Sequence, residues 1–89
     1  MNDQDLKFLE QYGLDRQILI EIVSTRMPFG KYQGVLICDL PEAFLIWFKG
    51  KGWPSGRLGI LLENTLEIKS NGANFILKQL QQALSNQKN

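Results

Sequence analysis

The side chains that most often carry out acid–base and metal chemistry are scarce in this sequence. It has no histidine and one cysteine, Cys38. Histidine is the commonest general base and metal ligand, and structural zinc sites need several cysteine or histidine ligands. Cys38 ends the apolar stretch 35–38, so we expect a small buried hydrophobe there. The inventory therefore excludes Cys/His zinc sites and a histidine-activated nucleophile.

Two pairs of carboxylates are close enough in sequence to act together. Asp39 and Glu42 flank the predicted start of a helix, where negative charge favours the helix dipole. Glu63 and Glu67 share one face of a later predicted helix. A catalytic or metal-binding role is the alternative for each pair, but no third convergent ligand accompanies them. We therefore predict that the protein is not an enzyme and has no catalytic residue, metal or cofactor.

The glycines do not form a familiar phosphate-binding loop. Gly30-Lys31 is followed by Tyr32 instead of serine or threonine, and the first glycine of a Walker pattern is missing before it. The glycines at 50, 52 and 56 miss the GxGxxG spacing by one residue. Both common nucleotide-binding signatures are therefore excluded.

Apolar periodicity predicts four or five helices. The expected helices are 5–12, 15–25, 41–49, 55–70 and 74–84. Residues 18–23 are rich in β-branched side chains, so a strand is left open there as an alternative. The helix at 41–49 is apolar almost all round, and we expect it to be the central buried helix, with Trp47 in the core.

A β-hairpin is predicted between the second and third of these helices. The apolar stretches 27–29 and 35–38 flank a short loop with a glycine at each end, Gly30 and Gly34, and positive φ is expected at these glycines. Pro28 places the first strand at an edge. Gly59, inside a predicted helix, is expected to tolerate a side chain. The predicted fold class is a small single α+β domain, four to five helices packed around one β-hairpin.

The hairpin segment also carries the most distinctive motif. Residues 27–34 are MPFGKYQG, and LPE at 40–42, WF at 47–48, GRLG at 56–59 and EIKSNG at 67–72 follow in order. This arrangement resembles a family of small bacterial proteins known as putative quorum-sensing-regulated virulence factors, over about residues 24–80. The family usually has lysine where this chain has Gln33. The resemblance implies a shared fold, but no molecular activity and no functional residue.

A shorter form of the octad is similar to one in the auxiliary domain that follows some exonuclease catalytic domains. That similarity covers about residues 26–47, and the acidic catalytic part of such enzymes is absent from this sequence. It implies a nucleic-acid accessory module without nuclease activity. Gln33 in place of lysine removes one cation from the surface that would contact the nucleic acid.

Length and composition are those of one globular domain, 1–89, with 44% apolar and 21% charged residues and a frayed tail expected at 85–89. A single cysteine precludes an intrachain disulfide. The N-terminal residues lack the apolar stretch of a secretory signal, and the longest apolar run, 43–48, is far below the ~20 residues of a membrane span. We expect a cytoplasmic protein that does not contact membranes.

The charge is uneven along the chain, and its middle is basic. Residues 26–57 have five lysines and arginines against two acids, whereas residues 1–25 have a net charge of −3. The predicted binding surface combines these cations with two aromatic residues. It consists of Lys31, Tyr32, Lys49, Lys51, Trp53 and Arg57.

Two functions fit this surface. We favour a non-catalytic protein-interaction or regulatory module, because a partner strand or a second copy could extend the edge of the hairpin and Trp53 could anchor an interface. The alternative is a nucleic-acid-binding module, in which the cations meet phosphates and Tyr32 and Trp53 stack on bases. The sequence leaves open whether the cations share one face.

Overall fold

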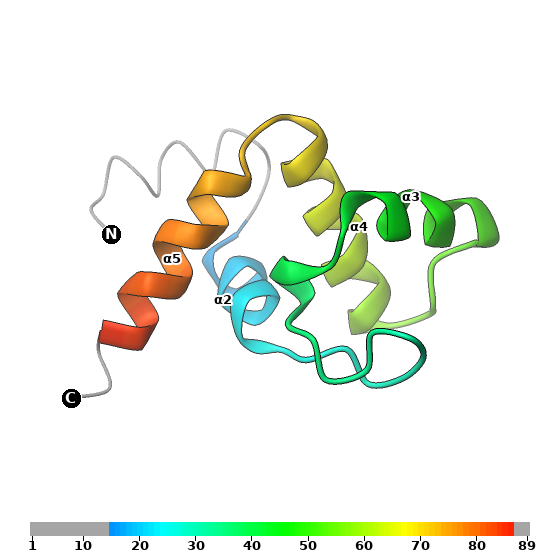
Figure 1. Ribbon diagram of the computed structural model, residues 1–89, viewed down its shortest axis with the longest axis horizontal. Coiled ribbons are helices and arrows are strands. Elements are labelled where there is room, and N and C mark those ends of the chain that lie inside the picture. The colour runs from blue at the N-terminus through cyan, green and yellow to red at the C-terminus, as the bar shows by residue number, and fades with distance from the viewer. Residues whose placement is uncertain (1–14, 87–89) are drawn as a thin grey trace.

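The computed structural model describes residues 15–86 (Figure 1). Its helices are α2 (Arg16–Ser24), the 3₁₀ helix η1 (Ile37–Asp39), α3 (Glu42–Lys51), α4 (Arg57–Ser70) and α5 (Asn74–Asn86). No β-strand occurs in this part of the chain, so the predicted α+β class is wrong: the fold is all-helical. The predicted helix at 5–12 and the tail residues 87–89 lie outside the described range.

Helix α2 forms despite its β-branched side chains. The carboxylate of Asp15 accepts a hydrogen bond from the backbone N–H of Ile18 at 2.7 Å, which caps the first turn. Leu19, Ile22 and Val23 are buried on one face. The helix predicted from Asp15 is confirmed and the alternative strand is wrong, because helical spacing buries these three side chains together.

The predicted hairpin is reduced to one isolated antiparallel bridge, between Arg26 and Leu36. Backbone bonds from Gly34 N–H to the Met27 carbonyl and from Met27 N–H to the Val35 carbonyl close the loop. Between them the chain coils through turns instead of pairing. Pro28 has no N–H for a ladder, which helps to explain why the pairing stops.

The second predicted strand, 35–38, also ends early. From Ile37 the chain turns into η1, where Ile37 and Cys38 are buried, and Leu40 beyond it is buried too. A strand would send alternate side chains to opposite faces, whereas the 3₁₀ turn directs these neighbouring apolar residues into one core.

The core lies between α4 and the helices around it. Helix α2 packs on α5, α4 and η1, and α3 packs on α4. In Figure 1, α3 and α5 lie on opposite sides of α4. The buried hydroxyl of Thr65 on α4 donates to the Leu61 carbonyl at 2.7 Å, so this core threonine is satisfied. The predicted α5 is confirmed, and it extends through the first two residues of the expected frayed tail.

Helix α3 is not the central buried helix that its composition predicts. Leu45 is its only buried residue, and Trp47 is 57% exposed. The position of Trp47 in the core is therefore a wrong prediction. A helix at the edge of a small domain can pack only one of its sides into the core. The remaining apolar side chains of α3 are therefore not fully buried.

The corner between α3 and α4 depends on close backbone approach. Gly52 ends α3 with φ 102°, and Gly56 precedes α4, which begins at Arg57, two residues after the start predicted at 55. Gly59 is buried, and a Cβ on it would overlap the carbonyl oxygen of Pro54. Gly59 therefore cannot accept a side chain freely, contrary to the prediction.

Candidate binding groove

Four apolar residues of α3, Ala43, Phe44, Trp47 and Phe48, line a groove of about 640 Å³. We call it the aromatic groove. Its two walls are the loop 27–32 and the exposed side of α3. The lining residues are Met27, Phe29, Gly30, Lys31, Tyr32, Pro41, Ala43, Phe44, Trp47, Phe48 and Lys51.

The loop wall is shaped by its glycines. Gly30 has φ +79° and Gly34 has φ +89°, which confirms the positive φ predicted for them, and no residue other than glycine adopts this conformation cheaply. The Gln33 N–H donates to the Gly30 carbonyl at 3.1 Å, and the Arg26 guanidinium donates to the Gly34 carbonyl at 2.7 Å. With the buried Met27 as its anchor, this loop holds its aromatic side chains against α3.

The helix wall follows from spacing along α3. Phe44, Trp47, Phe48 and Lys51 stand at positions i, i+3, i+4 and i+7, which form one stripe on a helix. All four line the groove, whereas Leu45 is on the part of α3 buried in the domain. Helix α3 thus has two apolar sides, one for the core and one for the groove.

The aromatic rings of the two walls contact one another. Tyr32 packs on Phe44 with ring centroids 4.7 Å apart, and Phe29 lies 6.5 Å from Phe48. Along α3, the Trp47 ring lies 6.0 Å from those of both Phe44 and Phe48. These contacts hold the rings in place, yet Trp47 and Phe29 remain 57% and 46% exposed. The groove therefore presents ordered aromatic surface to solvent.

Two lysines border this surface. The Lys31 ammonium lies 5.5 Å from the Tyr32 ring centroid, and that of Lys51 lies 5.9 Å from the Trp47 ring centroid. Both are cation–π distances. Among residues 15–86, no carboxylate lines the groove and neither lysine forms an ion pair. The aromatic groove is thus an apolar surface with a positive edge.

The structure brings together three of the six residues predicted as a binding surface. Lys31, Tyr32 and Lys51 line the groove. Lys49 is exposed on α3 and does not line the groove. Trp53 is partly buried, also outside the lining, and its ring stacks on that of Phe48 with centroids 5.9 Å apart.

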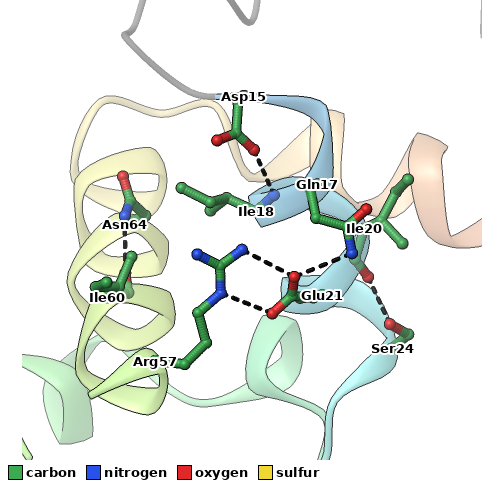
Figure 2. Close-up of polar contacts among 9 residues, drawn as sticks. All are labelled: Asp15, Gln17, Ile18, Ile20, Glu21, Ser24, Arg57, Ile60 and Asn64. Atoms are coloured by element: carbon green, nitrogen blue, oxygen red, sulfur yellow. Dashed lines mark hydrogen bonds and ion pairs between the residues drawn. The ribbon is translucent and has the colours of Figure 1, made fainter. Parts of the chain in front are cut away.

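Arg57, the last of the six residues, contacts α2 and does not line the groove. Its guanidinium donates from Nε and Nη2 to the two carboxylate oxygens of Glu21 on α2, each at 2.8 Å (Figure 2). This pairing lowers the pKa of the Glu21 carboxyl to about 2 and raises the pKa of Arg57. Arg57 therefore links two helices and adds no free cation to the groove.

The sequence prediction missed most of the groove. The helix at 41–49 was expected to be buried with Trp47 in the core, whereas Phe44, Trp47 and Phe48 all line the groove. The signal for this face of the helix is the stripe at 44, 47, 48 and 51, which ends in a lysine and so extends to solvent.

A second polar cluster lies where η1, α4 and α5 meet. Burial raises the pKa of the Cys38 thiol to about 11, with the neighbouring Asp39 charge adding to the effect. Burial also lowers the pKa of Lys69, whose ammonium donates to Asn74 Oδ1 at 2.9 Å. Asp39 pairs with Lys78 at 3.1 Å. The prediction that Cys38 is buried is confirmed.

Neither a metal cluster nor a membrane-spanning helix is present in the described part of the chain. Across residues 15–86, no group of three or more Cys, Asp and Glu side chains is placed to hold a metal ion. None of the helices there is long and apolar enough to cross a bilayer.

Comparison with known proteins gives the family. The family described as "putative quorum-sensing-regulated virulence factor" matches residues 15–80. The chain belongs to this family, which confirms the resemblance seen in the octad. The matched region contains every groove-lining residue and begins earlier than the 24–80 expected from the motifs, at the cap of α2.

The curated relatives are of similar size. The chain is 44% identical over 72 residues to the uncharacterized protein YpeB of Escherichia coli strain K12, and equally to that of Escherichia coli O157:H7. The alignment covers 80% of this chain and all of the relative. No solved structure matches. The comparisons thus establish the family.

Proposed function

We propose that the protein is a non-catalytic protein-interaction module whose aromatic groove binds a segment of a partner protein. The observation that carries the proposal is the exposure of Trp47 and Phe29 within an ordered ring cluster. Large apolar rings at the surface do not contribute the free energy that their burial would provide. A contiguous exposed apolar patch with a polar rim is typical of an interaction site.

The side chains of the groove are of the kind that dominate protein interfaces. Tryptophan and tyrosine are enriched among the few residues that provide most of the binding free energy. Trp47 and Tyr32 supply them here, already ordered by Phe44 between them. Rings fixed before binding lose little side-chain entropy on association. The groove is therefore suited to a segment that inserts apolar side chains between its two walls.

Site-specific photo-cross-linking in the native cells tests this proposal. A benzophenone amino acid replaces Trp47 in one variant and Phe75 in the other. Phe75 on α5 is the matched control. Its exposed fraction, 55%, is similar to that of Trp47, but it lies outside the groove lining. We expect a discrete protein adduct from position 47 and none from position 75.

Other outcomes of this experiment are equally informative. Identical adducts from both positions, or none from either, would contradict a protein site in the groove. A homodimeric adduct from position 47 would mean that the occupant is a second copy of the chain. An adduct removed by nuclease would favour nucleic acid instead.

Nucleic acid is the second candidate, because Lys31, Tyr32, Trp47 and Lys51 share one groove. Single-stranded nucleic acid binds where bases stack on aromatic rings and phosphates meet lysines. The pairing of Arg57 with Glu21 leaves fewer free cations than the sequence suggests. With two or three phosphate contacts, the logarithm of affinity for a labelled oligothymidylate should fall with log salt with a slope of about −1.5 to −2. No anisotropy change at ~50 mM salt and high micromolar protein would eliminate this candidate.

A further inference from the structure

We infer that the partner segment which enters the aromatic groove carries acidic residues beside its apolar anchor. The inference rests on the proposed function and names the chemistry of the partner. Its basis is the juxtaposition of two ammonium groups with an apolar wall. Lys31 on the loop and Lys51 at the end of α3 both line the groove, one from each wall.

Acidic side chains on α3, η1 and α2 contact residues outside the groove. Glu42, at the start of α3, accepts a hydrogen bond from Ser70 on α4 at 3.2 Å. Asp39 pairs with Lys78 on α5. Glu21 pairs with Arg57. The positive edge of the groove therefore lacks an internal counter-charge from these groups, and a carboxylate brought by a ligand can supply one.

The arrangement of lysines and rings disfavours a cationic ligand. Aromatic surfaces attract cations through the negative faces of their rings, and the five rings of the groove would by themselves favour an ammonium group. Here the ammonium groups of Lys31 and Lys51 lie near the Tyr32 and Trp47 rings. A ligand cation at those rings would meet like charge as well as the ring face. Selectivity for acidic over basic segments thus follows from repulsion as well as attraction.

The remaining walls favour an apolar anchor between the charges. Met27, Ala43, Phe44 and Phe48 contribute no polar side-chain atom other than a thioether sulfur, which is a weak acceptor. An anion alone would leave this surface exposed. A segment that places an aliphatic or aromatic side chain between the walls and a carboxylate at either edge covers both parts of the groove.

Selection from a library of random short displayed peptides tests the inference. The full-length chain is the bait. We expect enriched peptides to carry Asp or Glu next to a large apolar residue. The double variant Lys31→Glu/Lys51→Glu should bind these peptides about tenfold more weakly and, used as bait itself, should enrich Lys or Arg in the same positions. Lys49→Glu is the matched control, since it reverses a charge on α3 outside the groove and should change affinity less than about twofold.

The outcomes separate this inference from the proposed function. If Trp47→Ala abolishes the enrichment but the double charge reversal leaves it unchanged, the groove is still a protein-binding site and the acidic preference is overturned. No enrichment, or enrichment unaffected by Trp47→Ala, would contradict the proposed function itself. If a labelled oligothymidylate displaces the selected peptides, and its binding depends on Lys31 and Lys51, the ligand of the groove is nucleic acid and the inference of an acidic peptide is overturned.

Discussion

The guanidinium of Arg57 and the carboxylate of Glu21 form a two-pronged ion pair that joins the start of α4 to α2. Both hydrogen bonds measure 2.8 Å, and the Gln17 amide donates a third to Glu21 at 3.0 Å (Figure 2). Bidentate pairs fix orientation as well as distance. These bonds favour the ionised carboxylate and lower its pKa from 4.5 to about 2.

This lowered pKa predicts an acid-dependent loss of stability. Because the folded-state pKa of Glu21 lies below its ordinary value, the ion pair stabilises the fold fully above pH 4.5 and loses its effect as pH falls towards 2. In Glu21→Gln the melting temperature should be lower than in the wild type near neutral pH. That difference should shrink between pH 4.5 and 2. A difference of constant size over this interval, in melts followed by circular dichroism, would contradict the pairing.

Gly59 predicts a second, steric effect. A Cβ at this position would overlap the Pro54 carbonyl oxygen and lie 3.2 Å from the Pro54 carbonyl carbon. Both are backbone atoms, which cannot move aside as a flexible side chain would. We expect Gly59→Ala to destabilise the protein by about 1–3 kcal/mol in urea denaturation, although alanine is the better helix former.

Gly50 provides the matched control for that substitution. It too lies inside a helix, α3, but a Cβ there would meet nothing within 4 Å. Gly50→Ala should therefore stabilise the protein by about 0.5–1 kcal/mol. Equal effects at the two glycines would show that the corner between α3 and α4 is looser than described.

The helices were largely predictable because their signals are local. The cap at Asp15 and the end of α4 at Ser70, two residues before Gly72 with its φ of 72°, depend on neighbouring residues alone. The close approach of Gly59 to Pro54 was not predictable, because glycine inside a helix has the same local pattern whether or not another backbone lies against it.

The hairpin and the groove depended on information that is not local. Paired apolar stretches around glycines predict a ladder, but whether it extends depends on neighbouring strands, and none is present beside the Arg26–Leu36 bridge in the described chain. The apolar run of α3 predicts burial, but it does not show how many sides of the helix have other elements packed against them. Whether the predicted residues share one face was also not readable locally: Lys31, Tyr32 and Lys51 line one groove, whereas Arg57 pairs with Glu21, 36 residues earlier in the chain.

Truncation to alanine should destabilise the protein much more at Leu45 than at Trp47. Leu45 is fully buried and Trp47 is 57% exposed, although they lie two residues apart on α3. Leu45→Ala should cost about 2–5 kcal/mol of the free energy of unfolding, whereas Trp47→Ala should cost under about 1.5 kcal/mol because little of its ring leaves a packed core. Urea denaturation of both variants measures this. A larger cost at Trp47 would contradict its placement in the groove.

Cys38 should be almost unreactive in the folded protein. The thiolate is the reactive form, and burial raises the pKa of this thiol from 9.0 to about 11. At pH 8 the folded protein should therefore hold about a hundredfold less thiolate than the unfolded chain, and labelling by a disulfide reagent should be slower by at least that factor. The double variant Cys38→Ser/Ser85→Cys, with an exposed thiol near the end of α5, is the control and should react rapidly. Between pH 9 and 11 the folded protein keeps the Cys38 thiol protonated, whereas the unfolded chain loses that proton. The free energy of unfolding should therefore also decrease as pH rises from 9 towards 11. Native labelling of Cys38 as fast as that of the Ser85→Cys control would mean that the layer between η1 and α4 opens freely.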